Sequence, residues 1–323
     1  MQSRDAYIPG FDWVRLIGSI LVVLSHLNVF GNAYALNPSL YKMLGVLVPV
    51  FFIMSGYLRK RHFSKEGIFR QVIKYGAIYL AVDYCVVLYM HILEWIDCGQ
   101  FSFLGVAAQM LKGLVCSHSH AIGLWFIPSL LYPMLLNAFL GDRARKIVIG
   151  VAAVLFIATF TIGDDRLVRW FDELAGSHPV VGKLISGPLL VKRWRHLVTG
   201  LLYTTIGFDI DTWKVKPAWL LLAAVFFMVI ESLTCYLGVA VILLSILFFY
   251  LVKRLPGQFL YPYHLEISLF SCLMYFLHII QKDLFGLMTD SIPLIFFLIF
   301  GFNLAVTWAV SSFIRRKRQE AKL

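Results

Sequence analysis

The chain has 323 residues, of which 60% are hydrophobic and 15% aromatic, and it carries a formal net charge of +11. This composition excludes an ordinary soluble domain and predicts a polytopic membrane protein, whose first partner is the lipid bilayer. The charge does not indicate a nucleic-acid partner, because the basic residues cluster at the ends of apolar runs, where membrane topology explains them.

The first apolar segment, residues 11–31, contains an arginine and a histidine, Arg15 and His26. On an α-helix this spacing is close to three turns, so both side chains leave the same face, about 16 Å apart along the axis. A charge inside a bilayer costs roughly 2.5–3.5 kcal/mol, which makes both residues candidates for function. Small side chains between them predict a groove beside the backbone: Gly18, Ser19 and Val22. The alternative is a snorkelling arginine and a histidine that bonds a neighbouring helix.

Ten apolar segments of helical length follow one another along the chain. They cover residues 11–31, 43–58, 75–94, 121–140, 147–163, 196–210, 217–233, 236–252, 260–281 and 292–314. Most of the 29 basic residues fall in the connecting segments and termini on one side. We therefore expect an all-α fold of about ten transmembrane helices, forming a single domain over residues 1–323 with both termini in the cytoplasm.

Two outer segments, 95–120 and 164–195, are long enough to act as binding loops. His118 and His120 in the first lack a third ligand, so no metal site is expected. Five cysteines, an odd number, argue against a disulfide framework, although Cys98 and Cys116 would be able to pair in an oxidising compartment. Residues 166–175 have the pattern of a short interfacial amphipathic helix.

A dense basic segment, which we expect to be a cytoplasmic loop, follows the second apolar run. It contains one acidic residue, Glu66, and six basic residues: Arg59, Lys60, Arg61, Lys65, Arg70 and Lys74. This segment is either an ordinary cytoplasmic anchor or a binding site for the phosphates of a cytosolic cofactor, which arginine side chains bind well. Just before it, Ser55 and Gly56 allow close helix approach and supply a hydroxyl.

The ninth apolar segment carries a polar stripe. Its five residues have a 4-3-4-3 spacing that places them on one helix face: His264, Ser268, Ser271, Tyr275 and His278. Lipid would leave these groups unpaired, so the stripe must face the protein interior or a wet cavity. It either joins helices or lines a pathway. Three further ionisable residues in or near apolar runs have no partner that the sequence reveals: Asp83, Glu231 and Glu266.

Together these residues resemble the acyltransferase-3 family of integral membrane acyltransferases. The DWVR(10)H element comprises Asp12, Trp13, Arg15 and His26, and the FFxxSGY element comprises Phe51, Phe52, Ser55, Gly56 and Tyr57. An LWF element follows at Leu124 to Phe126, and a degenerate SxxxYxxH at Ser271, Tyr275 and His278. The paired arginines that the family carries in its basic loop are replaced here by Arg70 followed by Lys74. We expect a stand-alone member without an SGNH domain.

The resemblance implies an O-acyltransferase, in the first instance an O-acetyltransferase, in the bacterial cytoplasmic (inner) membrane. Cytosolic acyl-CoA, usually acetyl-CoA, is the implied donor, and the implied acceptor is a hydroxyl of a carbohydrate or glycan. His26 would be the general base on that hydroxyl, and Arg15 would orient the donor or stabilise charge. The implied donor contacts are Arg15, Ser55, Tyr57, Arg59, Arg61, Arg70 and Lys74. The implied acceptor contacts are Trp125, Ser271, Tyr275 and His278, and no metal is implied.

A second class of function also fits the ionisable residues and the polar stripe: a transporter or flippase of a small polar solute or lipid-linked glycan. Transporters are often built from two similar halves with broken helices at matching positions, and the sequence shows no such symmetry. Labelled acetyl-CoA would distinguish the two classes, because only an enzyme moves the label to an acceptor. A purely structural membrane protein is the third alternative and explains the polar faces least well.

Overall fold

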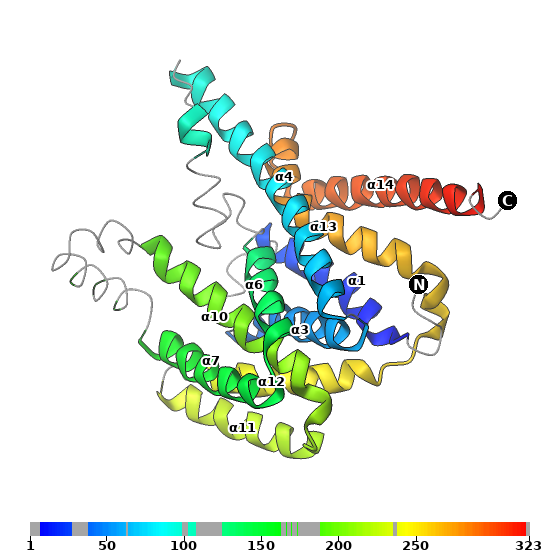
Figure 1. Cartoon of the computed structure of the whole chain (residues 1–323). Helices are drawn as coiled ribbons and strands as arrows, with labels where there is room; N and C mark the ends of the chain where they lie inside the picture. Colours follow the sequence, from blue (N-terminus) through cyan, green and yellow to red (C-terminus); the bar gives the residue numbers. More distant parts are fainter. Residues whose placement is uncertain are drawn as a thin grey trace. The chain divides into compact units, whose positions relative to one another are not determined.

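The structure is a computed structural model. It describes residues 7–27, 38–62, 64–98, 103–107, 125–162, 188–234 and 238–320, together with residues 166, 169 and 173. Every regular element in these ranges is a helix (Figure 1). The predicted all-α fold class is therefore confirmed. The predictions on Cys116, His118 and His120, and most of the predicted helix 166–175, lie outside the described residues.

Ten longer α-helices follow one another along the chain. They are α1 (Pro9–His26), α3 (Pro38–His62), α4 (Lys65–Cys98), α6 (Phe126–Phe139), α7 (Asp142–Ile162), α10 (Pro188–Asp209), α11 (Pro217–Thr234), α12 (Val239–Lys253), α13 (His264–Gly286) and α14 (Ile292–Glu320). Two short 3-10 helices are also present. The first, η2 (Ile210–Thr212), extends α10, and the second, η3 (Gln258–Tyr263), precedes α13. Each of the ten apolar segments predicted from the sequence overlaps one of these α-helices.

Two helices among the described residues are long and apolar enough to cross a membrane: Lys65–Tyr89 within α4, and α14. A third span results if α12 and the helix that follows its bend, Gln258–Tyr275, are counted as one broken span. Large apolar side chains on α14 are exposed, including Phe297 at 66% and Trp308 at 72%, as expected of a surface that lipid covers. These features indicate a membrane-associated helical protein, and the number of ten spans stays a prediction.

The chain divides into two compact units. Unit 1 comprises Met1–Phe51 and Phe248–Leu323, and unit 2 comprises Phe52–Leu247. Each has packed helices of its own, and the single domain expected over the whole chain stays a prediction.

In unit 1, α13 packs between α1 and α14. Its apolar core contains Val23 of α1 and Leu27 directly after that helix, Phe270 and Met274 of α13, and Ile299 of α14.

The two helices α13 and α14 run antiparallel, because the later of two contacts along α13 falls at the earlier position on α14. Glu266 in the first turn of α13 pairs with Arg315 near the end of α14. Farther along, the side-chain amides of Gln281 and Asn303 exchange two hydrogen bonds of 3.0 and 3.1 Å. This exchange satisfies two buried polar groups that lipid would leave unpaired.

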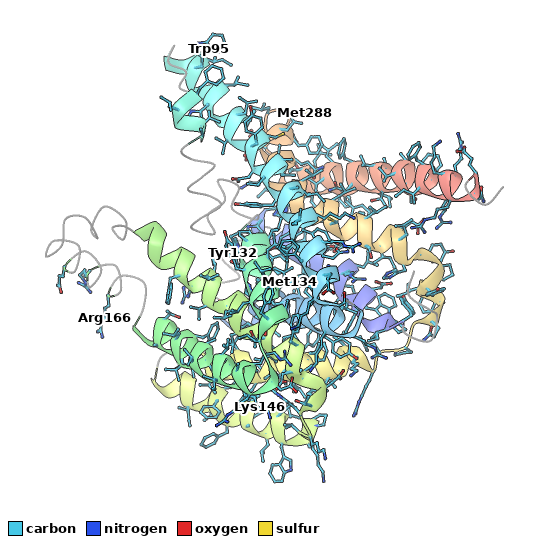
Figure 2. All side chains as sticks on the ribbon, in the orientation of Figure 1. Trp95, Tyr132, Met134, Lys146, Arg166 and Met288 are labelled. Atoms are coloured by element: carbon cyan, nitrogen blue, oxygen red, sulfur yellow. The ribbon has the colours of Figure 1, made fainter. Side chains whose placement is uncertain are left out.

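In unit 2, α6 and α10 run parallel and approach each other closely. A Cβ placed on Gly200 would lie 1.9 Å from the carbonyl oxygen of Ser129, so only glycine fits there. Farther along, the Asn137 amide donates to Thr205 Oγ1 at 2.9 Å. Met134 of α6 is fully buried, whereas Tyr132, two residues earlier, is exposed (Figure 2).

The glycine of the FFxxSGY element has a packing role in unit 2. A Cβ on Gly56 would meet the Thr204 carbonyl oxygen at 2.2 Å, and one on Gly207 would meet the Ile53 carbonyl oxygen at 2.2 Å. The backbones of α3 and α10 therefore touch at this point, as the small-residue pattern predicts.

The basic segment after α3 is not an extended loop. Arg59 and Arg61 belong to the last turns of α3, and Arg70 and Lys74 belong to the first turns of α4. The two helices follow each other so closely that the basic side chains project from two helix ends.

Candidate functional site

The polar residues of α1 and α13 meet at two places along one interface. Asp12 lies beside His264 at the start of both helices, and His26 lies beside His278 farther along. Both helices advance by the same number of residues between these contacts, so they run parallel and in register. The predicted stripe on α13 therefore faces α1. About 21 Å of helix separates the two places.

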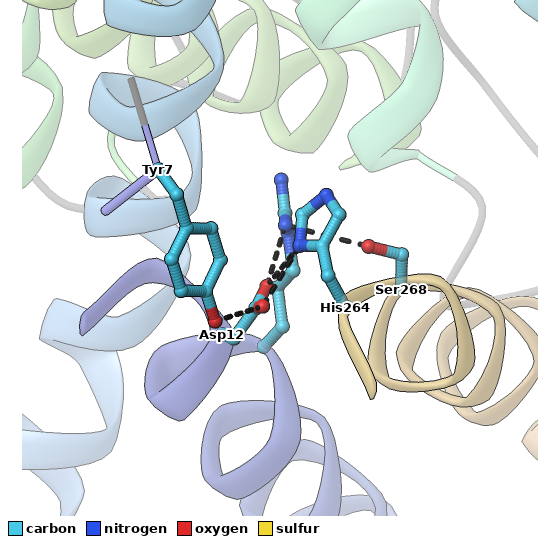
Figure 3. A network of polar contacts seen from close by, with 5 residues as sticks. Tyr7, Asp12, His264 and Ser268 are labelled. Atoms are coloured by element: carbon cyan, nitrogen blue, oxygen red, sulfur yellow. Dashed lines mark hydrogen bonds and ion pairs between the residues drawn. The ribbon is translucent and has the colours of Figure 1, made fainter. Parts of the chain in front are cut away.

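The first place, here called the charged end, consists of Tyr7, Asp12, Arg15, His264 and Ser268. Figure 3 shows this network and labels Tyr7, Asp12, His264 and Ser268. The Asp12 side chain is buried, with 1% of its surface exposed. Its carboxylate accepts hydrogen bonds from Tyr7 Oη at 2.8 Å, from Arg15 Nη1 at 2.8 Å and from His264 Nδ1 at 2.8 Å. Arg15 Nη1 also lies 3.4 Å from Ser268 Oγ. Three donors thus surround one buried carboxylate.

Local sequence explains why these groups meet. Pro9 begins α1 with a backbone angle suited to a helix start, and it places Asp12 in the first turn, where a negative charge is favourable. Tyr7 precedes the helix, and burial together with its hydrogen bond to Asp12 raises the pKa of its hydroxyl, which stays protonated and donates. His264 is the first residue of α13.

The second place, here called the imidazole end, consists of His26, Tyr275 and His278. The ring centroids of His26 and His278 are 5.1 Å apart, and the ring planes are tilted by 38°. The Tyr275 ring centroid lies 6.4 Å from that of His278. His278 is buried, with 1% of its surface exposed, and its Nδ1 donates to the carbonyl oxygens of Met274 at 2.8 Å and Tyr275 at 3.0 Å.

The predicted site residues of α1 and α13 are thus partly brought together. His26, Tyr275 and His278 share the imidazole end, whereas Arg15 belongs to the charged end and binds Asp12. Ser271 is buried on α13.

The predicted groove between Arg15 and His26 is filled at its centre. A Cβ on Gly18 would lie 3.0 Å from the ring of Phe51, and the buried Ser19 hydroxyl donates to the Leu16 carbonyl oxygen. The prediction of open space beside Gly18 is therefore wrong, because an aromatic ring of α3 occupies it.

In unit 2, aromatic rings organise the basic residues at the junction of α3 and α4. The Arg59 guanidinium lies 5.4 Å from the Tyr75 ring centroid, and Lys74 Nζ lies 5.9 Å from the same centroid. Tyr57 lies one turn before Arg61 and accepts a hydrogen bond of 2.6 Å from the Arg61 guanidinium. Ser55 is half-buried on α3, and Arg70 is exposed on α4.

In unit 2, Phe52 of the FFxxSGY element meets Trp125 and Phe126 of the LWF element, whose Leu124 lies outside the described residues. The Phe52 ring centroid lies 4.3 Å from that of Phe126 and 6.2 Å from that of Trp125. The indole of Trp125 stacks on the imidazole of His196, with centroids 3.9 Å apart and an angle of 18° between the planes. One face of Trp125 is therefore already covered by a neighbouring ring.

Comparisons with known proteins leave the family open. No family model matches the chain, and neither the curated proteins nor the solved structures provide a match. The resemblance to the acyltransferase-3 family therefore stays a prediction based on the elements quoted above.

Sequence reasoning did not assign a role to Asp12 or His264. The sequence does contain a signal for each residue. Asp12 lies three residues before Arg15, the spacing of a helical ion pair, and His264 is the first residue of the polar stripe. Their pairing across a long stretch of sequence carried no local signal.

Proposed function

We propose that the chain is an integral membrane O-acyltransferase, with about ten spans and both termini in the cytoplasm. It moves an acyl group, in the first instance acetyl, from cytosolic acyl-CoA to a hydroxyl of a carbohydrate acceptor. The observation that carries this proposal is the imidazole end, where two histidines from distant parts of the chain lie ring to ring. Histidine is the residue most often used to remove a proton from an attacking hydroxyl.

The reaction needs one base. The acceptor oxygen attacks the thioester carbonyl carbon while the neutral ring of His26 takes the hydroxyl proton. The carbon–sulfur bond then breaks, and His26 returns the proton to the CoA thiolate. The products are an ester and a free thiol, and His26 ends in its starting state.

Charged and aromatic groups elsewhere supply binding functions in this proposal. Arginine and lysine side chains bind phosphate oxygens, so the donor's phosphates are assigned to Arg59, Arg61, Arg70 and Lys74, with Ser55 and Tyr57 alongside. Arg15 is also assigned to the donor, and it keeps its ion pair with Asp12 while it binds the donor. Trp125, Ser271 and Tyr275 are assigned to the acceptor, and His278 of the same stripe lies beside His26.

Helix directions are compatible with the ten-span arrangement. Spans one and nine would cross in the same direction, and α1 and α13 run parallel. Span ten would return, and α14 runs antiparallel to α13. The inner membrane is the location in which cytosolic acyl-CoA and surface glycans are both within reach.

The test uses the purified full-length protein in liposomes with acetyl-CoA labelled in the acetyl group and a panel of glycan acceptors. Transfer of the label to an acceptor is expected, and His26→Ala should reduce it by roughly 10²- to 10⁴-fold. Cys272→Ser, an exposed position on α13, is the matched control and should keep wild-type transfer. Label that stays on CoA while a solute crosses the bilayer would support the transporter alternative instead.

A further inference from the structure

The imidazole of His278 is held in one tautomer by its own helix. Its Nδ1 lies 2.8 Å from the Met274 carbonyl oxygen and 3.0 Å from the Tyr275 carbonyl oxygen. A carbonyl oxygen only accepts hydrogen bonds, so Nδ1 carries the hydrogen. The other ring nitrogen, Nε2, is then a lone-pair acceptor.

This acceptor has no partner among the described residues. His278 is buried, with 1% of its surface exposed, and Nε2 receives no hydrogen bond there. Buried polar atoms are nearly always paired in folded proteins, since an unpaired one loses its bonds to water without replacement. Nε2 of His278 is therefore placed to receive a donor that arrives from a neighbouring group or a ligand.

The neighbouring group is the ring of His26. Its centroid is 5.1 Å from that of His278. Two imidazoles joined by an N–H···N hydrogen bond of ordinary length have centroids about 5 Å apart. The separation already has this value, the ring planes are tilted by 38°, and Nε2 of His278 has no hydrogen-bond partner in this arrangement. His26 is half-buried, so the described residues cover only part of its ring.

We propose that His278 is a positioning residue for His26, resting on the function proposed above. Nε2 of His278 accepts a hydrogen bond from the ring N–H of His26, which leaves the opposite nitrogen of His26 as the lone pair facing the acceptor hydroxyl. When that nitrogen takes the hydroxyl proton, the bond to His278 stabilises the imidazolium. His278 stays neutral throughout, and the proton goes to the departing thiolate as before.

The charged end is not a competing site of this kind. The Asp12 carboxylate already accepts hydrogen bonds from three donors, which join the starts of α1 and α13. This carboxylate therefore needs no ligand to satisfy its hydrogen bonds.

Nitrogen-15 NMR of the full-length protein, labelled at histidine and reconstituted in bilayers, tests the pairing without any need for activity. His26→Ala identifies the signals of His26. In the wild type, His26 should show one protonated and one lone-pair nitrogen, with the protonated one correlated to Nε2 of His278. His278→Leu should convert His26 to a mixture of tautomers, and His278→Gln, whose side-chain oxygen also accepts, should retain one tautomer. Wild-type His26 already in a mixture, or unchanged in His278→Leu, overturns the proposal.

Transfer kinetics provide the second readout. His278→Leu should lower kcat roughly 10- to 100-fold with both KM values unchanged, the size typical of a lost orienting partner. His278→Gln should recover much of this loss. A raised KM for the acceptor with unchanged kcat would mean that His278 binds the acceptor and would contradict the positioning role. If the wild type transfers no label to any acceptor, the proposed function fails, and the NMR result alone then decides the pairing.

Discussion

The charged end and the imidazole end lie on the same pair of helices and differ in how their polar groups are satisfied. At the charged end, a buried carboxylate accepts from a phenol, a guanidinium and an imidazole, which joins the start of α1 to the start of α13. At the imidazole end, one buried ring nitrogen has no partner among the described residues. The first arrangement is complete without a ligand, and the second is not.

This difference separates two roles that the sequence pattern had merged. Arg15 and His26 were expected to act together because they share a helix face. In the structure Arg15 neutralises Asp12, and His26 meets His278. The charge of Arg15 is thus explained by a local partner at one end, and the proposed chemistry is assigned to the other end. Substitutions at the two ends should therefore affect different properties of the protein.

The largest effect is expected for Asp12→Ala. This change leaves Tyr7, Arg15 and His264 without their common acceptor, and breaking a buried ion pair by removing one partner costs about 3–5 kcal/mol. The free energy of unfolding, measured by denaturant titration in detergent micelles, should fall by that amount. His26→Ala at the other end is the matched comparison and should cost less than about 1 kcal/mol. Equal losses in the two variants would remove the distinction between the ends.

A smaller effect is expected for Gly10→Ala beside the charged end. A Cβ at Gly10 would lie 1.7 Å from the carbonyl oxygen of Val252, so backbone must move, and overpacking of this kind costs roughly 1–3 kcal/mol. Gly286→Ala, in the last turn of α13, is the control, because no atom lies within 4 Å of its Cβ position. The melting temperature should fall in the first variant and hold in the second. A fall in both would show that the loss belongs to glycine replacement in general.

Much of the fold followed from sequence because its signals are local. Runs of apolar residues placed all ten segments on α-helices, and the 4-3-4-3 spacing placed the stripe of α13 on the face that meets α1. The Gly56 contact with Thr204 likewise agrees with the small-residue rule. The basic segment was misjudged as a loop, since arginine and lysine favour helices and no proline or run of glycines interrupts them.

The site was predicted less completely because its contacts join distant parts of the chain. Periodicity marks the faces of α1 and α13 but does not set their register, so the pairs Asp12–His264 and His26–His278 had no sequence signal. The predicted groove failed for a related reason. Gly18 and Ser19 indicate room beside the helix, but they do not indicate that the ring of Phe51 fills it.

The smallest effect is expected for Ser268→Ala, and it sharpens the boundary between the two ends. Ser268 Oγ lies 3.4 Å from Arg15 Nη1, near the upper limit for a hydrogen bond, whereas Asp12 holds the same nitrogen at 2.8 Å. Loss of the hydroxyl should therefore change the free energy of unfolding by less than about 0.5 kcal/mol. Because Ser268 also belongs to the polar stripe, acetyl transfer by this variant is the deciding measurement. Unchanged transfer would mean that only the stripe residues at the imidazole end take part in the reaction. A loss of transfer at unchanged stability would mean that the residues involved in transfer extend along α13 to the charged end.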